Sequence, residues 1–387
     1  MNRGLHHRPF WLLGFLGAAW LLGQGAVSPA VAGNQPDERR AQGLAEGASG
    51  WRFLQTGKAS DAVQAFSRAL NVLPNEPSFY VGLGTAYVKL HKEEEAERLF
   101  EHAIELDANA TSAHALLGDL SARKTDWDGA IRHYRIAVRQ DPNDVSLEDR
   151  LRTAQHNQSA EAGFDRLFMP HFVVKFPGAS DRALARDVAE RLEIIYLEIG
   201  QGFGYFPAKP TIVVLYPERR FQEAAMGPEW AGGLFDGILR FSVEGLRPSR
   251  KEAERSLRHE YTHALVNGLA GGHAPAWLSE GLAQAFDGGT GADPDRQPAG
   301  DPNRLIPLHS LHGSFVGLTR EAAQQAYGDS YRATRALIGR HGMSQVRALL
   351  IALADQPDFD RTFEHVLHER YRDFEAAWMG THTGRRF

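Results

Sequence analysis

Two patterns of hydrophobic and polar positions divide the chain near Gly163. Before this glycine, apolar residues recur at the spacing of one face of an α-helix. The same pattern returns after 34 residues, and small residues hold the positions where paired helices approach closely, whereas large ones fill the space between helices. The residues in register are Gly50, Gly84 and Gly118; Ala62, Ala96 and Ala130; and Phe66, Phe100 and Tyr134.

This 34-residue unit is similar to the tetratricopeptide repeat. Three copies run from about Leu44 to Val145, and the amphipathic stretch SLEDRLRTAQHN after them predicts a capping helix, so that the repeat region covers residues 44–160. Such repeats stack because none buries its apolar face alone, and the stack presents a concave groove that suits a protein or peptide partner. The alternative is chance periodicity in Ala-rich helices, and the number of positions in register argues against it.

The second half of the chain predicts a small sheet followed by packed helices. An amphipathic helix is expected at 181–199, between strand-like apolar runs. From residue 250 onward the pattern is almost entirely helical, apart from a Gly/Pro/Asp-rich loop at 287–304. The whole chain is therefore expected to be α+β, with an all-α first domain. The predicted strands are 171–176, 210–217 and 233–242.

Residues 1–32 are typical of a secretory signal peptide and not of a folded domain. Arg3 and Arg8 make a basic start, and the apolar run FWLLGFLGAAWLL that follows is shorter than a membrane-spanning helix. Small residues end the segment at Ala32. We therefore expect cleavage after Ala32 and an exported, periplasmic protein whose mature chain has no membrane span. An uncleaved N-terminal anchor is the alternative.

The composition of the chain bears on two questions: whether it binds nucleic acid, and which residue types could bind a metal ion. The 387 residues carry a formal net charge of −5, and removal of Arg3 and Arg8 with the signal takes it to −7. This mild acidity argues against nucleic acid as a partner. The chain has no cysteine, so any metal site must be built from His, Asp and Glu.

The stretch HEYTH offers two ligands for one divalent metal ion. Ser249 and Glu252 form a capping box that begins a predicted helix around it. On this helix His259 and His263 lie one turn apart on the same face, so both rings can reach one ion. Glu260, beside them, is placed to work as a general base. Two solvated histidines on a helix surface are the alternative for this motif alone.

A second stretch, WLSEG, offers a third ligand. Pro275 starts another helix after a Gly-rich turn, and Glu280 follows His263 after 16 intervening residues. A carboxylate brought back by a tight connection completes three ligands and leaves a fourth position open, as in catalytic zinc sites. A structural zinc site is disfavoured, because the sequence offers no fourth protein ligand nearby.

The pair of motifs resembles that of the gluzincin zinc metallopeptidases, and with the repeats in front the chain is similar to bacterial exported proteins that have a peptidase MA-like domain. The resemblance covers residues 168–380. It implies a Zn²⁺ ion held by His259, His263 and Glu280, with Glu260 as the catalytic base that hydrolyses peptide bonds in a peptide or protein substrate. The run GLFDGILRF resembles the edge strand along which the substrate backbone lies in such enzymes.

The resemblance implies two further roles. Gluzincins place a Tyr or His where it holds the oxyanion, and Tyr327 is the first candidate, with Tyr331 one turn later as the other. Some gluzincins also have an acidic residue four positions after the glutamate ligand, which holds a ligand histidine. This chain has Gln284 there, and a neutral amide would weaken the hold on zinc. The alternative function is an exported repeat scaffold whose metallopeptidase-like domain is inactive.

Overall fold

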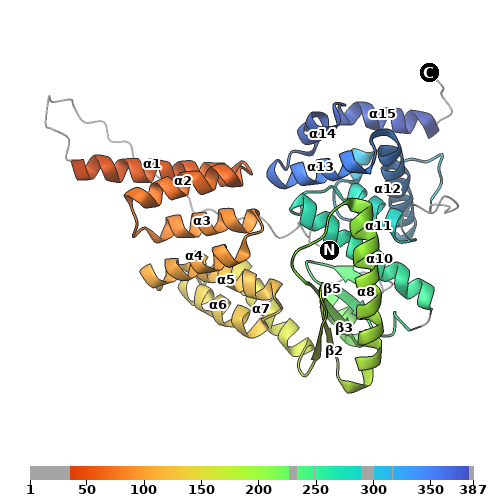
Figure 1. Cartoon of the computed structure of the whole chain (residues 1–387), viewed down its shortest axis with the longest axis horizontal. Coiled ribbons are helices and arrows are strands. Elements are labelled where there is room, and N and C mark those ends of the chain that lie inside the picture. Colours follow the sequence, from red (N-terminus) through yellow and green to blue (C-terminus); the bar gives the residue numbers. More distant parts are fainter. Residues whose placement is uncertain (1–34, 226–232, 248, 289–299, 316, 383–387) are drawn as a thin grey trace, which may run out of the picture.

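A stack of antiparallel helices, red to yellow in Figure 1, forms the N-terminal part of the molecule. We call it the repeat module, and its first helix already begins ahead of the predicted start of the repeats at residue 44. The computed structural model describes residues 35–225, 233–247, 249–288, 300–315 and 317–382. The helices of the module are α1 (Gln35–Gln55), α2 (Ala59–Val72), α3 (Pro77–Lys89), α4 (Glu93–Leu106), α5 (Thr111–Arg123), α6 (Trp127–Gln140) and the closing helix α7 (Val145–Ala160).

Helix pairs of the repeat module close on the small residues that the 34-residue period predicts. The aromatic residues Phe100 and Tyr134 of the second helices are buried against glycines of the first helices. A Cβ on Gly84 would lie 2.5 Å from the ring of Phe100, and one on Gly118 would lie 2.4 Å from the ring of Tyr134. A side chain does not fit at these positions, which explains why the glycines keep the repeat step. The predicted repeat architecture is confirmed.

A five-stranded mixed sheet opens the second part of the chain, with strands in the order β1, β2, β3, β5, β4. The three central strands run parallel, and each edge strand is antiparallel to its neighbour. The strands are β1 (Asp165–Phe168), β2 (Phe172–Phe176), β3 (Thr211–Tyr216), β4 (Gly233–Phe235) and β5 (Leu239–Ser242). The helix α8 (Arg182–Phe203) connects β2 to β3, as the sequence predicts.

The prediction of a single strand at 233–242 is wrong. The segment forms a hairpin of β4 and β5 that turns at Asp236 and Gly237, and Gly237 has a φ of 103° that favours glycine. The edge strand β1 was not predicted, because its four residues alternate between half-buried and exposed positions and include only two apolar side chains.

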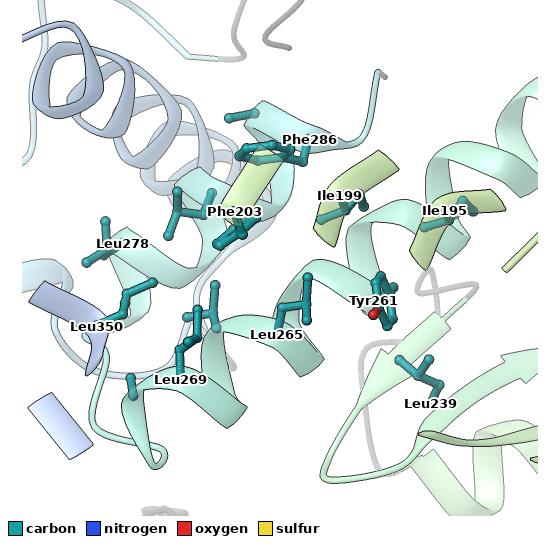
Figure 2. Packing of buried hydrophobic residues seen from close by; sticks show 14 of the residues in the cluster. Ile195, Ile199, Phe203, Leu239, Tyr261, Leu265, Leu269, Leu278, Phe286 and Leu350 are labelled. Carbon is teal, nitrogen blue, oxygen red and sulfur yellow. The ribbon is translucent and has the colours of Figure 1, made fainter. Parts of the chain in front are cut away.

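Different parts of the chain cover the two faces of the sheet. The helices α8 and α10 (Arg250–Ala270) cover one face and form the main core with it, which includes Leu239 of β5. Figure 2 shows Ile199 of α8 and Leu265 of α10 in this core. On the other face, Tyr216 belongs to the same core cluster as Trp127 of the repeat module. The sheet is therefore buried on both sides, and one of its covers comes from the repeats.

Most of the remaining helices pack beyond α10 (Figure 1), whereas α9 packs against β3, β5 and α7 on the face of the sheet that the repeat module covers. Helices α11 and α12 are in tight contact, since a Cβ on Gly281 of α11 would lie 2.1 Å from Oγ1 of Thr334 in α12. Within the described residues, no helix is both long and apolar enough to cross a membrane. The predicted signal peptide lies outside the described residues. The bounds of α9 are Glu218–Ala225, and the helices beyond α10 are α11 (Ala276–Phe286), α12 (Arg320–His341), α13 (Met343–Asp355), α14 (Phe359–Leu367) and α15 (Tyr371–His382).

Turns of the repeat module also lie against the second part of the chain. Nζ of Lys209, in the loop after α8, lies 2.8 Å from a carboxylate oxygen of Glu94 at the start of α4. A Cβ on Gly57, in the turn between α1 and α2, would lie 2.8 Å from the backbone oxygen of Asp355 at the end of α13. The contact between the two parts therefore extends from the first repeat to the last.

Candidate metal centre

The helix α10 carries two of the three candidate ligands. Its start is capped as expected, because the Ser249 hydroxyl accepts a hydrogen bond from the backbone N–H of Glu252 at 3.4 Å. The helix ends at Gly271, which has a left-handed φ of 58°. Between these ends His259 and His263 lie one turn apart, and their rings meet edge to face with centroids 4.8 Å apart.

The helix α11 brings the third ligand to the same point. Nε2 of His259 lies 3.2 Å from Nε2 of His263. Oε2 of Glu280 lies 3.5 Å from each of these two nitrogens. Zinc ligands about 2.0–2.1 Å from a tetrahedral ion stand roughly 3.3 Å from one another, so these spacings fit such an ion.

The state of the Glu280 carboxylate supports a cation at this point. Its Oε2 atom is buried and makes no hydrogen bond within the described part of the chain. Among the described residues, His259, His263 and Glu280 also form the one group of three side chains that could hold a metal ion. The donor set of two imidazoles and one carboxylate suits zinc.

The charges of this group compensate one another. Burial alone would raise the pKa of Glu280, but the neighbouring histidines outweigh burial and hold that pKa well below its usual range. Burial would lower the pKa of His263, and the charge of Glu280 outweighs it, so that this pKa is raised. The site thus favours an anionic carboxylate beside positive charge, which a divalent cation can supply in place of protons.

Glu260 lies between the ligands and the edge strand β4. Glu260 is only 9% exposed, and the nearby backbone N–H of Phe235 acts to lower the pKa of its carboxyl group. A Cβ on Gly233 would lie 2.9 Å from Cγ of Glu260, so the strand approaches the carboxylate closely. Burial raises the pKa of Glu260, and the charges of His259 and His263 oppose that rise. A buried carboxylate beside a metal site can accept a proton and pass it on.

The group that supports His263 is Ser279, which the sequence analysis did not identify. Its hydroxyl lies 2.9 Å from Nδ1 of His263 and leaves Nε2 for the metal. The Gln284 amide instead donates hydrogen bonds to the backbone oxygens of Tyr327, at 2.8 Å, and Glu280, at 3.3 Å. For His263, the supporting role expected of Gln284 therefore belongs to Ser279. The one feature of the sequence that points to Ser279 is its position directly before the ligand Glu280.

The two candidate tyrosines lie in different surroundings. Tyr331 is 5% exposed and belongs to the main core. Tyr327 is half-buried, and its pKa is raised first by burial and then by the charges of Glu280 and Glu260. Its phenol therefore lies within the electrostatic field of both carboxylates. Tyr327 therefore stays the first candidate of the two.

Comparison with known proteins gives the same division of the chain. Residues 195–381 match the family model of the Peptidase MA superfamily, and residues 53–120 match that of the Tetratricopeptide repeat. Hsp70-Hsp90 organizing protein 2 of Arabidopsis thaliana is 28% identical over 112 residues, which are 29% of this chain and 20% of that protein. DnaJ protein P58IPK homolog B of Oryza sativa subsp. japonica is 26% identical over 103 residues, which are 26% of this chain and 22% of that protein.

The match to these curated relatives thus spans only about a fifth of their length. Among solved structures, "First TPR of Spaghetti (RPAP3) bound to HSP90 peptide SRMEEVD" is similar to 31% of this chain and is itself covered to 98%, with 20% sequence identity and a TM-score of 0.30.

Proposed function

Because the chain carries a Peptidase MA superfamily domain behind tetratricopeptide repeats, we propose that it is a zinc-dependent peptide-bond hydrolase. The observation that carries the proposal is the convergence of His259, His263 and Glu280, whose donor atoms are spaced as zinc ligands are. Three protein ligands leave room for a reacting group, which distinguishes a catalytic site from a closed structural one.

When bound, zinc would supply Lewis-acid chemistry, which polarises a carbonyl group and lowers the pKa of water. Glu260 would take a proton from the attacking water and pass it to the leaving amine. The hydroxyl of Tyr327 would donate a hydrogen bond to the oxyanion. β4 is the last strand of the sheet and passes directly beside Glu260, so its outer edge would hold the substrate backbone.

The repeat module would bind a protein or peptide partner in its groove. The composition of residues 1–32 supports export to the periplasm, with the signal removed after Ala32. A peptide or protein is the expected substrate, and the mild negative charge of the chain does not suit nucleic acid.

Elemental analysis combined with peptide cleavage tests the proposal. Wild-type protein should contain one zinc ion per chain and cleave a peptide library, and a chelator should abolish the cleavage until zinc is added back. Glu280→Ala should lose both zinc and activity. Glu260→Gln should keep zinc and lose about 10²–10⁴-fold in turnover, because the general base is removed.

Glu252→Gln is the matched control, since Glu252 lies exposed in the first turn of the same helix and glutamine also suits a capping box. Full activity of Glu260→Gln would contradict the assignment of the base. Tight zinc binding by the wild type without cleavage of any peptide would favour the alternative function, an exported scaffold with an inactive metallopeptidase-like domain.

A further inference from the structure

A group of buried charges lies on the face of the sheet that the repeat module covers. Lys175 of β2 is 4% exposed and Arg240 of β5 is 3% exposed. Nζ of Lys175 donates to a carboxylate oxygen of Glu161 at 2.6 Å and to the backbone oxygen of Thr125 at 3.1 Å. Glu161 caps the closing helix α7, and Thr125 lies in the last repeat. Because an unpaired buried charge is strongly destabilising, the sheet depends on the repeat module for these partners.

Arg240 extends this group of charges to the hairpin of β4 and β5. Its Nη1 atom donates to the Tyr216 hydroxyl at 2.5 Å, and this hydroxyl donates to Glu161 at 2.8 Å. Its Nε atom donates to both carboxylate oxygens of Asp236, at 3.2 and 3.0 Å. Asp236 lies in the turn of the hairpin, where it also accepts the backbone N–H of Ile238. One guanidinium group thus joins the hairpin to the closing helix of the repeats.

The hairpin in turn contacts the proposed base. Asp236 directly follows β4, and Gly233 of this strand lies so close to Glu260 that a Cβ on it would be 2.9 Å from Cγ of that side chain. β4 has only three residues and lies at the edge of the sheet, so few ladder hydrogen bonds hold it. A central strand is held by ladder hydrogen bonds on both sides. β4 lacks these on one side, so its position beside Glu260 depends more on the ion pair between Arg240 and Asp236.

We propose that Arg240 is a positioning residue of the hydrolase, which holds the β4–β5 hairpin beside Glu260 by anchoring it to Glu161 of the repeat module. The effect of Arg240 on catalysis rests on the proposed function, whereas its effect on the hairpin does not. The repeats then have a role besides partner binding, because their closing helix supplies a counter-charge on which the edge strand of the site depends.

Two variants of the full-length chain test this proposal. Asp236→Asn keeps an oxygen for the N–H of Ile238 and removes the charge that pairs with Arg240; Glu161→Gln removes the charge on the side of the repeats. Asp165→Asn is the matched control, because Asp165 pairs with Arg182 at 3.0 Å on the opposite edge of the same sheet. The side chains of Asp165 and Asp236 are also equally exposed, at 44% and 43%.

Three measurements apply to each variant: zinc per chain, kcat and KM for peptide cleavage, and hydrogen–deuterium exchange of residues 233–242. Asp236→Asn and Glu161→Gln should lower kcat by about 10-fold or more, with a smaller change in KM, because a misplaced base loses its alignment. Zinc content should stay at the wild-type level, and exchange in the hairpin should become faster. Asp165→Asn should match the wild type in all three measurements.

The proposal is overturned if Asp236→Asn and Glu161→Gln match Asp165→Asn in both kcat and hairpin exchange. If Glu161→Gln fails to fold, Asp236→Asn decides alone, because its side chain is half-exposed. If the wild type cleaves no peptide, the proposed function fails, and the exchange of residues 233–242 still shows whether the Arg240 anchor holds the hairpin.

Discussion

The Ser279→Ala variant probes how His263 is held at the metal centre. The Ser279 hydroxyl lies 2.9 Å from Nδ1 of His263 and fixes the ring with Nε2 towards the other two ligands. Loss of a hydrogen bond to a ligand histidine lowers metal affinity by about 10–100-fold. That loss corresponds to roughly 1.4–2.8 kcal/mol of binding free energy. Alanine is a better helix former than serine, so α11 itself should not be weakened.

Zinc affinity is measured by competition with a chromophoric chelator at fixed pH. Ser67→Ala is the matched control, because Ser67 is a half-buried helical serine whose hydroxyl donates to the backbone oxygen of Val63 at 2.7 Å, far from the site in sequence. We expect weaker zinc binding only in Ser279→Ala, with turnover recovered at saturating zinc. Wild-type affinity in Ser279→Ala would refute the reasoning, because Ser279 would then not orient the ligand.

Three further predictions concern the oxyanion, the repeats and pH. Tyr327→Phe should keep zinc and lower kcat by about 10²–10³-fold in peptide cleavage, as loss of one oxyanion donor does. Gly118→Ala should lower the free energy of unfolding in urea by about 1–3 kcal/mol, because its Cβ would lie 2.4 Å from the ring of Tyr134. The Nδ1 atoms of His114 and His133 lie 3.2 Å apart, and burial lowers the pKa of both histidines. Just below pH 6.5 the unfolded chain therefore binds more protons than the folded chain. Thermal stability should therefore fall as pH drops through about 6.5 towards the lower folded pKa values, and His133→Asn should reduce this fall.

Each of these predictions has its own control. Tyr331→Phe should leave kcat nearly unchanged, and equal losses in both tyrosine variants would rule out a specific role for Tyr327. Gly339→Ala adds a methyl group where no atom lies within 4 Å, so it should not destabilise α12, and an equal loss in both glycine variants would argue against crowding. His156 is exposed, and His156→Asn should keep the wild-type pH dependence.

The metal ligands could be predicted because they depend on short-range spacing. Two histidines four apart on one helix must share a face, and a short Gly-rich turn returns the next helix to the same place. Ser279 could not be predicted, because its contact with His263 depends on how α11 is rotated against α10. The close approach of Gly233 to Glu260 could not be predicted either, because it depends on how the edge of the sheet meets α10. The hairpin turn at Gly237 was missed because the apolar residues on both sides of it suggested one continuous strand.

The sequence by itself determined the main helices, two of the central strands and the repeated pairing of helices, because these follow from contacts between residues close in the chain. It did not determine what covers each face of the sheet. Lys175 stands within the run FVVKF, where nothing in the spacing shows that it is buried or that Glu161 is its partner. Only the packing of the closing repeat helix on the sheet decided this pairing, because a charge is buried only where a distant partner can neutralise it.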